Sequence, residues 1–238
     1  MIYMPYGDSA MLINFEQKID PSINQKVMAL HRALEVSGIA GITFLIPAYC
    51  SLTIGFDKNV ISFSELKSTI DSFAKEEMNQ LSNNASRLVH IPVCYESPFK
   101  LDMLDVMEHT QLSRKNIISL HTSIKFRVYM LGFVAGFAYM GKLPQSLNCP
   151  RKSVPRIIVP EGSVGLAGLQ TGIYPTEAPG GWQIIGRTPL KMFDHDNASP
   201  SLLQPGDEVQ FKAIDKIEFD AIEKLQSVGE YELEVCNG

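Results

Sequence analysis

The chain has 238 residues, of which 45% are hydrophobic and 20% are charged, and its formal net charge is −5 at pH 7. This composition is typical of a globular protein with one large domain or two small ones, and the acidic balance gives no basic face for nucleic acid. No apolar run approaches the roughly 20 residues that span a bilayer, and the N-terminus shows no signal-peptide pattern. We therefore expect no nucleic-acid partner and no membrane insertion.

The cysteines and most of the histidines form no metal-binding pattern. The cysteines are far apart and form no CxxC pair, and four histidines show no ligand spacing with a cysteine or a carboxylate. These residues are Cys50, Cys94, Cys149, Cys236, His31, His90, His109 and His195. We predict no metal on this chain. Cysteines without a secretion signal indicate reduced thiols, which predicts a cytoplasmic protein.

The first part of the chain begins with a strand and a helix. Ala10 to Phe15 is a short apolar strand, and Asp20 followed by Pro21 predicts a helix start. Gly38 is well placed to end this helix. Its buried face is expected to carry apolar residues at helical spacing, namely Ile23, Val27, Leu30 and Leu34.

A hairpin and a second helix follow. Ile42 to Ala48 and Ser51 to Phe56 are β-rich runs joined by a short turn. Ser62 and Glu65 form a capping-box pattern, and Arg87 to Tyr95 supplies a closing strand. The residues expected to be buried by the second helix are Leu66, Ile70, Phe73 and Leu81. The order β-α-β-β-α-β predicts a small ferredoxin-like unit.

A polar, turn-prone run at 83–86 predicts a domain boundary. It gives an N-terminal domain over 1–86 and a second domain over 87–238, although Arg87 to Tyr95 could belong to either side. The second domain is expected to hold two short helices and many short strands punctuated by proline and glycine, which predicts a closed or sandwiched all-β domain. The helices are expected over Leu101–His109 and Ser113–His121, and the strands over Ile124–Leu131, Arg156–Val159, Val164–Ala167, Gly172–Tyr174, Trp182–Gly186, Leu190–Phe193, Glu208–Ile214 and Tyr231–Val235.

Glycines and aromatic residues are concentrated between Tyr129 and Asp194. Glycine allows positive φ and close backbone approach, and aromatic rings give large, rigid apolar faces. Two interpretations fit this density about equally, a β-barrel with tight corners and the shaped wall of a pocket.

Four segments of this stretch carry a resemblance to a known family: LGFVAGFAYMG, the pair Pro155-Arg156, VPEGSVGLAGLQTGIYP and PGGWQIIGRTPLKMFD. The chain resembles the KipI / 5-oxoprolinase B-subunit (PxpB) family, also called allophanate hydrolase subunit 1, over nearly its full length. The N-terminal part matches more loosely. The family usually has proline at the position of Ala135 and a second glycine at that of Lys142, and both departures concern the shape of the first glycine-rich loop.

The resemblance implies an α+β protein with a small α/β N-terminal domain followed by a cyclophilin-like all-β barrel. It also implies the B subunit of an ATP-dependent 5-oxoprolinase, which converts 5-oxo-L-proline to L-glutamate together with its A and C subunits. ATP would be used through that complex. Two alternatives stay open: an inhibitor of a sporulation histidine kinase, and a urea or allophanate amidohydrolase or carboxyltransferase component.

Several residues are candidates for contact with a substrate. Arg187 and Arg156 could each grip a carboxylate or phosphoryl group, or each could form a structural salt bridge. Gln170 offers an amide suited to a lactam or urea-like group, or it could brace a loop. Phe133, Phe137, Tyr174 and Trp182 are expected to shape a concave, aromatic-lined hollow that a partner subunit completes.

Two further features have functional and structural interpretations. His121 is the candidate acid or base, although a single histidine without a partner is more often structural. The spaced glycines near 162–168 lack the lysine of a nucleotide loop and are either a β-turn-β corner or a backbone nest for an anion. The residues assigned to such a backbone loop are Gly162, Ser163, Gly165, Gly180 and Gly181.

Overall fold

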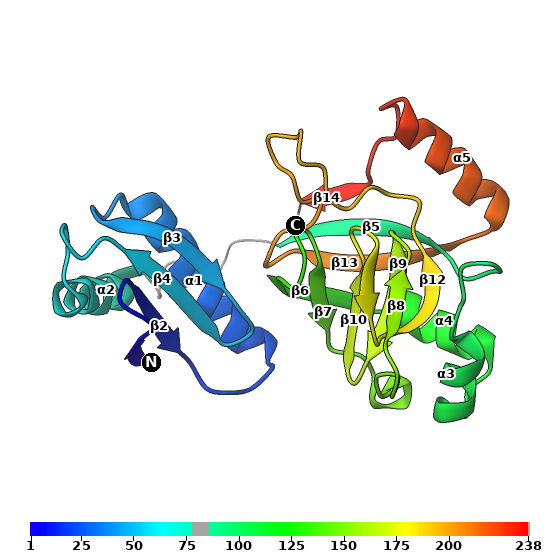
Figure 1. Ribbon diagram of the computed structural model, residues 1–238, viewed down its shortest axis with the longest axis horizontal. Coiled ribbons are helices and arrows are strands. Elements are labelled where there is room, and N and C mark those ends of the chain that lie inside the picture. The colour runs from blue at the N-terminus through cyan, green and yellow to red at the C-terminus, as the bar shows by residue number, and fades with distance from the viewer. Residues whose placement is uncertain (78–85, 238) are drawn as a thin grey trace. The chain divides into compact units, whose positions relative to one another are not determined.

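The computed structural model describes residues 1–77 and 86–237. The chain divides into two units, Met1–Ala85 and Ser86–Gly238, which we describe separately (Figure 1). Leu81 and most of the predicted boundary run at 83–86 lie outside the described residues. In the described part of the chain, none of the helices combines the length and the apolarity needed to cross a bilayer.

The N-terminal unit is a four-stranded antiparallel sheet with two helices. The strands are β1 (Ile2–Pro5), β2 (Ala10–Asn14), β3 (Ile42–Pro47) and β4 (Ser51–Phe56), in the order β1-β2-β4-β3. The helices are α1 (Pro21–Ser37) and α2 (Phe63–Glu77). Apolar residues of the sheet and both helices form one core, which includes Ile13, Leu30, Ile54 and Leu66.

The predicted helix signals of this unit are confirmed. The Asp20 carboxylate accepts a hydrogen bond from the Ser22 N–H at 2.9 Å, and Gly38 ends α1 with φ 62°. Before α2, the Ser62 N–H donates to the Glu65 carboxylate at 2.9 Å and the Glu65 N–H donates back to the Ser62 hydroxyl at 3.3 Å. Each cap satisfies backbone groups that have no partner within the helix.

The predicted closing strand of this unit is wrong. Arg87 to Cys94 forms β5, which belongs to the sheet of the second unit. It pairs there with β12 (Gln183–Arg187), β13 (Glu208–Ile214) and β14 (Val235–Asn237). The edge position next to β2 is taken by β1, which precedes it in the chain. β1 is mostly exposed and shows no alternating apolar pattern, so periodicity could not reveal it. The N-terminal order is therefore β-β-α-β-β-α.

The second unit is a closed seven-stranded barrel, and the predicted α+β class with an α/β unit followed by a barrel is confirmed. The ring runs β12-β9-β10-β7-β6-β13-β5, and it closes where Arg187 of β12 pairs with Cys94 of β5. Closure leaves no open sheet edge within the ring. Besides β5, the strands of the ring are β6 (Lys125–Leu131), β7 (Ala138–Gly141), β9 (Ser163–Ala167), β10 (Gln170–Ile173), β12 (Gln183–Arg187) and β13 (Glu208–Ile214).

Further elements surround the ring. β8 (Arg156–Val159) and β11 (Ala178–Gly180) form a separate two-stranded ribbon. β14 (Val235–Asn237) pairs with β5, and Figure 1 shows the two strands next to each other. The helices are α3 (Met103–Thr110), α4 (Arg114–Thr122) and α5 (Lys216–Ser227), with a 3₁₀ turn at Gln145–Leu147. The strand predicted over Leu190–Phe193 is wrong, because only an isolated bridge between Phe193 and Ser201 forms there.

Apolar side chains fill the barrel interior. Alternate residues of each strand point inward, so Ala138 and Met140 of β7 and Val164 and Leu166 of β9 join one large core. The residues between them point to the outer face of the barrel wall. There Tyr139 of β7 and Ala167 of β9 join a second cluster, which also contains Val159 of β8. The wall between β7 and β12 is therefore packed on both of its faces.

Candidate functional site

A pocket of about 290 Å³ lies where the end of β12 meets α5. Arg187 is the last residue of β12, and the Lys191 N–H donates to the Gln226 side-chain oxygen at 2.9 Å, which ties the following loop to the helix. The lining residues are Glu161, Gly162, Arg187, Thr188, Pro189, Leu190, Lys191, Glu223, Gln226 and Ser227. We call this the Arg187 pocket. Two cationic and two carboxylate side chains line it, and Pro189 and Leu190 add apolar surface.

The Arg187 guanidinium is poorly satisfied by the protein. Its Nε is buried and has no hydrogen-bond partner among the described residues, and none of the ion pairs in the described part of the chain involves Arg187. Its guanidinium carbon lies 5.7 Å from the centre of the Phe99 ring, a distance at which a cation is attracted to an aromatic face. A buried donor left unpaired costs about 1–3 kcal/mol, so an anionic group in this pocket would recover that cost.

Gly162 makes room for this arginine. A Cβ at Gly162 would lie 2.4 Å from the Thr188 carbonyl oxygen and 3.3 Å from the Arg187 Cγ, and the residue has φ 76°. Its N–H donates to the Tyr174 carbonyl and its own carbonyl accepts from the Thr188 N–H. The Ser163 N–H likewise donates to the Pro160 carbonyl. These groups bond within the protein, so the geometry favours a turn-and-strand role here over an anion nest.

Three of the predicted pocket-wall aromatics, Phe137, Tyr174 and Trp182, pack with Tyr139 into an aromatic layer. The Phe137 ring centre lies 5.2 Å from that of Tyr174 and 5.4 Å from that of Trp182, both in edge-to-face contact. Such contacts add to the stability gained from burying the rings. Phe133 caps this layer at 5.7 Å from Phe137, with its side chain exposed and φ 71°.

Two glycines of the predicted backbone loop belong to the neighbourhood of this layer. A Cβ at Gly180 would lie 2.0 Å from the Tyr174 hydroxyl oxygen, so glycine is required for the tyrosine to pack. Gly181 accepts a hydrogen bond from the Lys152 N–H at 2.7 Å. Gly165 of β9 lies opposite Gly172 of β10 in the barrel wall. Gly180 and Gly165 therefore serve close packing and strand pairing, whereas Gly181 contributes a backbone carbonyl that any residue could supply.

The structure does not bring Gln170 and Arg187 together. Gln170 pairs with Ala167 at one end of β9, whereas Arg187 pairs with Ser163 at the other end. Four residues of strand separate these positions by about 13 Å. Gln170 is partly buried at the start of β10. The two residues that were expected to face one substrate thus occupy different parts of the barrel.

Arg156 is engaged in a buried ion-pair cluster around Asp102, which sequence reasoning missed. Both terminal nitrogens of Arg156 bond the Asp102 carboxylate, at 2.7 and 2.5 Å, and the Lys152 ammonium bonds it at 2.8 Å. The Ile184 N–H of β12 also donates to it, at 2.7 Å. Burial opposes ionisation of Asp102, but these hydrogen bonds hold its pKa below the usual range.

Asp102 precedes α3 and therefore looks like a simple helix cap in the sequence, yet its side chain makes no cap hydrogen bond. It joins α3 to β8 and β12 instead. For Arg156 the geometry favours the structural alternative, because the guanidinium already has a bidentate carboxylate partner. A charge pair spaced 54 residues apart leaves no local pattern by which the sequence could have revealed it.

His121 is fully buried in the barrel unit, where its ring stacks on Phe211 with centres 4.3 Å apart. Its Nδ1 lies 2.8 Å from the Tyr95 hydroxyl and its Nε2 lies 2.9 Å from the Thr171 hydroxyl, which donates onward to the Gly165 carbonyl. This chain is satisfied when Tyr95 donates to Nδ1 and His121 donates from Nε2. Burial lowers the pKa of His121 to about 3. The geometry favours a structural role, because both ring nitrogens are already paired.

Comparison with known proteins supplies the family. A model of the carboxyltransferase domain, subdomain C and D, matches residues 1–203. The 5-oxoprolinase B subunit of Bacillus subtilis is 39% identical over 90% of this chain and 93% of its own length. That of Haemophilus influenzae is 36% identical over 89% of this chain and 97% of its own length.

The chain belongs to the family of 5-oxoprolinase B subunits. This confirms the resemblance inferred from the glycine-rich segments. The crystal structure of TTHA0988 is similar to this chain, with a TM-score of 0.79 and 32% sequence identity. The match covers 87% of this chain but only 40% of the longer TTHA0988 chain. The family departures Ala135 and Lys142 both have exposed side chains in this structure.

Proposed function

We propose that this chain is the B subunit of an ATP-dependent 5-oxoprolinase, which hydrolyses 5-oxo-L-proline to L-glutamate as ATP becomes ADP and phosphate. The observation that carries this proposal is the match to the 5-oxoprolinase B subunit of Bacillus subtilis over 93% of that protein. The name of that relative describes one subunit of an assembly. We therefore propose that this chain acts with an A and a C subunit, which complete the reactive groups.

The chemistry accounts for the use of ATP. A five-membered lactam is a stabilised amide with a poor leaving group, and phosphorylation of its carbonyl oxygen makes the ring carbon electrophilic. Water then adds to that carbon and the C–N bond breaks, with the nitrogen taking a proton. A second water hydrolyses the resulting acyl phosphate, so two waters are consumed for each glutamate and each phosphate released. ATP would be bound through the complex, since the sequence has no P-loop of its own.

The Arg187 pocket is the part of this chain that we assign to the substrate. A guanidinium binds a carboxylate through two parallel hydrogen bonds, and 5-oxoproline carries one carboxylate. The Arg187 Nε, which is buried and has no partner in the part of the chain that the structure describes, supports this assignment. Gln170 lies at the other end of β9, so we propose that it contacts a partner subunit or a separate part of the substrate path.

An exposed apolar strand supports contact with a partner subunit. Ile157 and Ile158 of β8 are 87% and 54% exposed, and nearby Val154 is 76% exposed. Positions 154, 157 and 158 lie within five residues of chain, and such a concentration of exposed large apolar side chains favours a protein contact in this region. A kinase inhibitor would use such a surface as well, so an inactive complete set in the experiment below would favour that alternative.

The test is reconstitution from purified components. The chain is combined with the A and C subunits of a 5-oxoprolinase, and glutamate release from 5-oxoproline is measured with ATP, with ADP, and with each subunit omitted in turn. We expect turnover only with ATP and all three chains. An inactive complete set would overturn the proposal. Turnover of urea or allophanate in its place would assign the chain to the carboxyltransferase alternative.

A further inference from the structure

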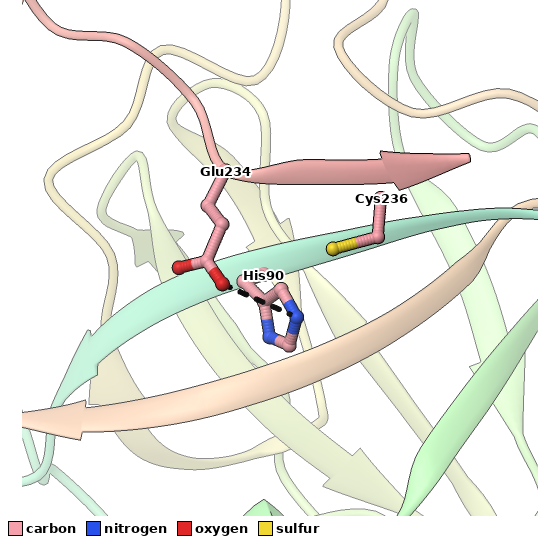
Figure 2. Close-up of side chains that lie close together, drawn as sticks. All are labelled: His90, Glu234 and Cys236. Carbon is pink, nitrogen blue, oxygen red and sulfur yellow. Dashed lines mark ion pairs between the residues drawn. The ribbon is translucent and has the colours of Figure 1, made fainter. Parts of the chain in front are cut away.

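Three potential metal ligands meet where the C-terminal strand pairs with the barrel. β14 runs antiparallel to β5 with Val235 opposite Val89 and Cys236 opposite Leu88. The His90 N–H donates to the Glu234 carbonyl at 3.0 Å, so this pairing continues one residue further. Because side chains alternate between the two faces of a sheet, His90, Glu234 and Cys236 share one face (Figure 2).

Their donor atoms are close enough for one ion. One donor atom from each residue lies within 4.8 Å of the others. A tetrahedral zinc ion with bonds of about 2.0–2.3 Å holds its ligand atoms roughly 3.3–3.8 Å apart. The Glu234 and Cys236 side chains are exposed, so small rotations about their own bonds can close the remaining gap without moving the strands.

His90 is not satisfied by the protein alone. Its side chain is only 13% exposed, and its Nδ1 is buried without a hydrogen-bond partner among the described residues. Its Nε2 lies 3.6 Å from a Glu234 oxygen, which is too long for a hydrogen bond. Among the described residues, Nε2 therefore has no hydrogen-bond partner although it faces Glu234, and a metal ion on Nε2 would give that nitrogen a partner while Nδ1 stays buried.

Glu234 is held ready as an anionic ligand. One of its oxygens pairs with the Lys212 ammonium, and the other faces His90. A glutamate side chain is ionised at neutral pH. Hydrogen bonds to a ligating carboxylate orient it and are a usual feature of metal sites.

We propose that His90, Glu234 and Cys236 bind a zinc ion, with the fourth position open to water or to a group from another molecule. Imidazole, carboxylate and thiolate are the ligand types that zinc takes in proteins, and thiolate disfavours magnesium and calcium. Binding requires Cys236 to lose its thiol proton to solvent, and no redox change is involved. The ion would fasten the three-residue strand β14 to β5.

No sequence pattern points to this site, and the sequence predicted no metal. His90 lies near the start of the second unit and the other two ligands lie at its end, so they meet only through strand pairing. A second cluster, Asp194, His195 and Asp196, also brings donor atoms within 4.8 Å. It consists of consecutive residues with the His195 side chain 80% exposed, and it lacks a buried, unsatisfied ligand. It therefore serves as a control and not as a second proposal.

Cobalt titration of the reduced full-length chain tests the proposal. Tetrahedral cobalt bound by a thiolate gives a sulfur-to-metal charge-transfer band and strong visible bands, both of which zinc should remove. We expect the bands to saturate at one equivalent, to be lost in Cys236→Ser, and to need at least ten-fold more cobalt in His90→Gln and Glu234→Gln. Cys50→Ser and His195→Gln should leave them unchanged.

A second measurement needs no variant. Zinc should slow alkylation of Cys236 at least ten-fold in the unaltered protein, as measured by mass spectrometry, while the rate at Cys50 stays the same. Absence of a thiolate band, a band that persists in Cys236→Ser, or equal alkylation of Cys236 with and without zinc would each overturn the proposal.

Discussion

The aromatic layer and the Arg187 side of the Arg187 pocket come from the same stretch of sequence, whereas α5 supplies the other side of the pocket. The two regions differ in packing. In the aromatic layer, Phe137, Tyr174 and Trp182 interlock edge to face and are almost completely buried. In the Arg187 pocket, charged side chains surround about 290 Å³ of open space and one buried nitrogen has no partner among the described residues. The first region contributes stability, and the second offers a place for a ligand.

Glycine serves both regions through close approach. Gly180 lets the Tyr174 ring pack against its backbone, whereas Gly162 lets the Arg187 stem pass beside the Thr188 carbonyl. What separates the two outcomes is the neighbouring side chain. A ring beside glycine fills the space and completes a core, while a guanidinium beside glycine leaves a polar group that still needs a partner.

The largest expected effect comes from opening the aromatic layer. Trp182→Ala should lower the free energy of unfolding by about 3–5 kcal/mol, because a large buried ring is replaced by a cavity. Lys191→Ala in the Arg187 pocket should change it by no more than about 0.5 kcal/mol, since that side chain is exposed. Urea unfolding of both variants measures the difference. Equal losses would show that the two regions contribute alike to stability.

Gly162→Ala tests the close approach in the pocket, with Gly168→Ala as its matched control. Both residues have positive φ, 76° and 59°, so both substitutions carry a left-handed cost of about 1–2 kcal/mol. Only the Cβ at 162 meets the Thr188 carbonyl, whereas nothing lies within 4 Å at 168. Gly162→Ala should therefore be about 1–3 kcal/mol less stable than Gly168→Ala in urea unfolding. Equal stability of the two variants would mean that the backbone around Thr188 can shift without a measurable loss of free energy.

Local signals explain which parts of this fold could be predicted. The Asp20–Pro21 start, the Gly38 end and the Ser62–Glu65 cap all act within one turn of a helix, and the structure forms each of them. The sheet that contains β5 could not be predicted, because its parallel neighbour β13 comes much later in the chain, after all the other strands of the ring. Local patterns identify a strand, but long-range packing decides which sheet contains it.

The same contrast between local signals and long-range packing explains why the sequence predicted only part of the candidate site. Arg187 was selected because a guanidinium in an apolar strand needs a partner, and it does line a pocket. The sequence could not separate Arg187 from the aromatic layer, since both lie in one glycine-rich run, and it gave no sign that α5 lines the pocket. Asp102 was missed because an aspartate before a helix looks like a cap, and its true partners lie 50 and 54 residues away.

The pH dependence of stability tests the polar chain inside the barrel, which unlike the pocket is fully paired. The folded protein holds the pKa of His121 at about 3, below the ordinary 6.5, so the unfolded state binds more protons between these values. Stability from this group is therefore complete above about pH 6.5 and falls as the pH decreases, by up to about 1.4 kcal/mol per pH unit. Between about pH 6.5 and pH 5 the loss is about 2 kcal/mol.

Urea unfolding across this range should show a shallower slope for His121→Asn than for the unaltered chain, since asparagine does not titrate. His195→Asn should keep the original slope, because the His195 side chain is 80% exposed. An unchanged slope in His121→Asn would assign the acid sensitivity to other groups.

Arg187→Lys should have the smallest effect on stability and the greatest effect on activity. Arg187→Lys keeps the positive charge but loses the planar fork that binds a carboxylate at two points. In the reconstituted enzyme, the KM for 5-oxoproline should rise about ten-fold, which corresponds to about 1.4 kcal/mol, while the free energy of unfolding changes by less than about 0.5 kcal/mol.

Arg156→Lys is the matched control, since Arg156 is already paired with Asp102. It should lose stability and leave KM unchanged. An unchanged KM in Arg187→Lys would remove the pocket from the substrate path, and a large loss of stability there would make Arg187 a structural residue like Arg156.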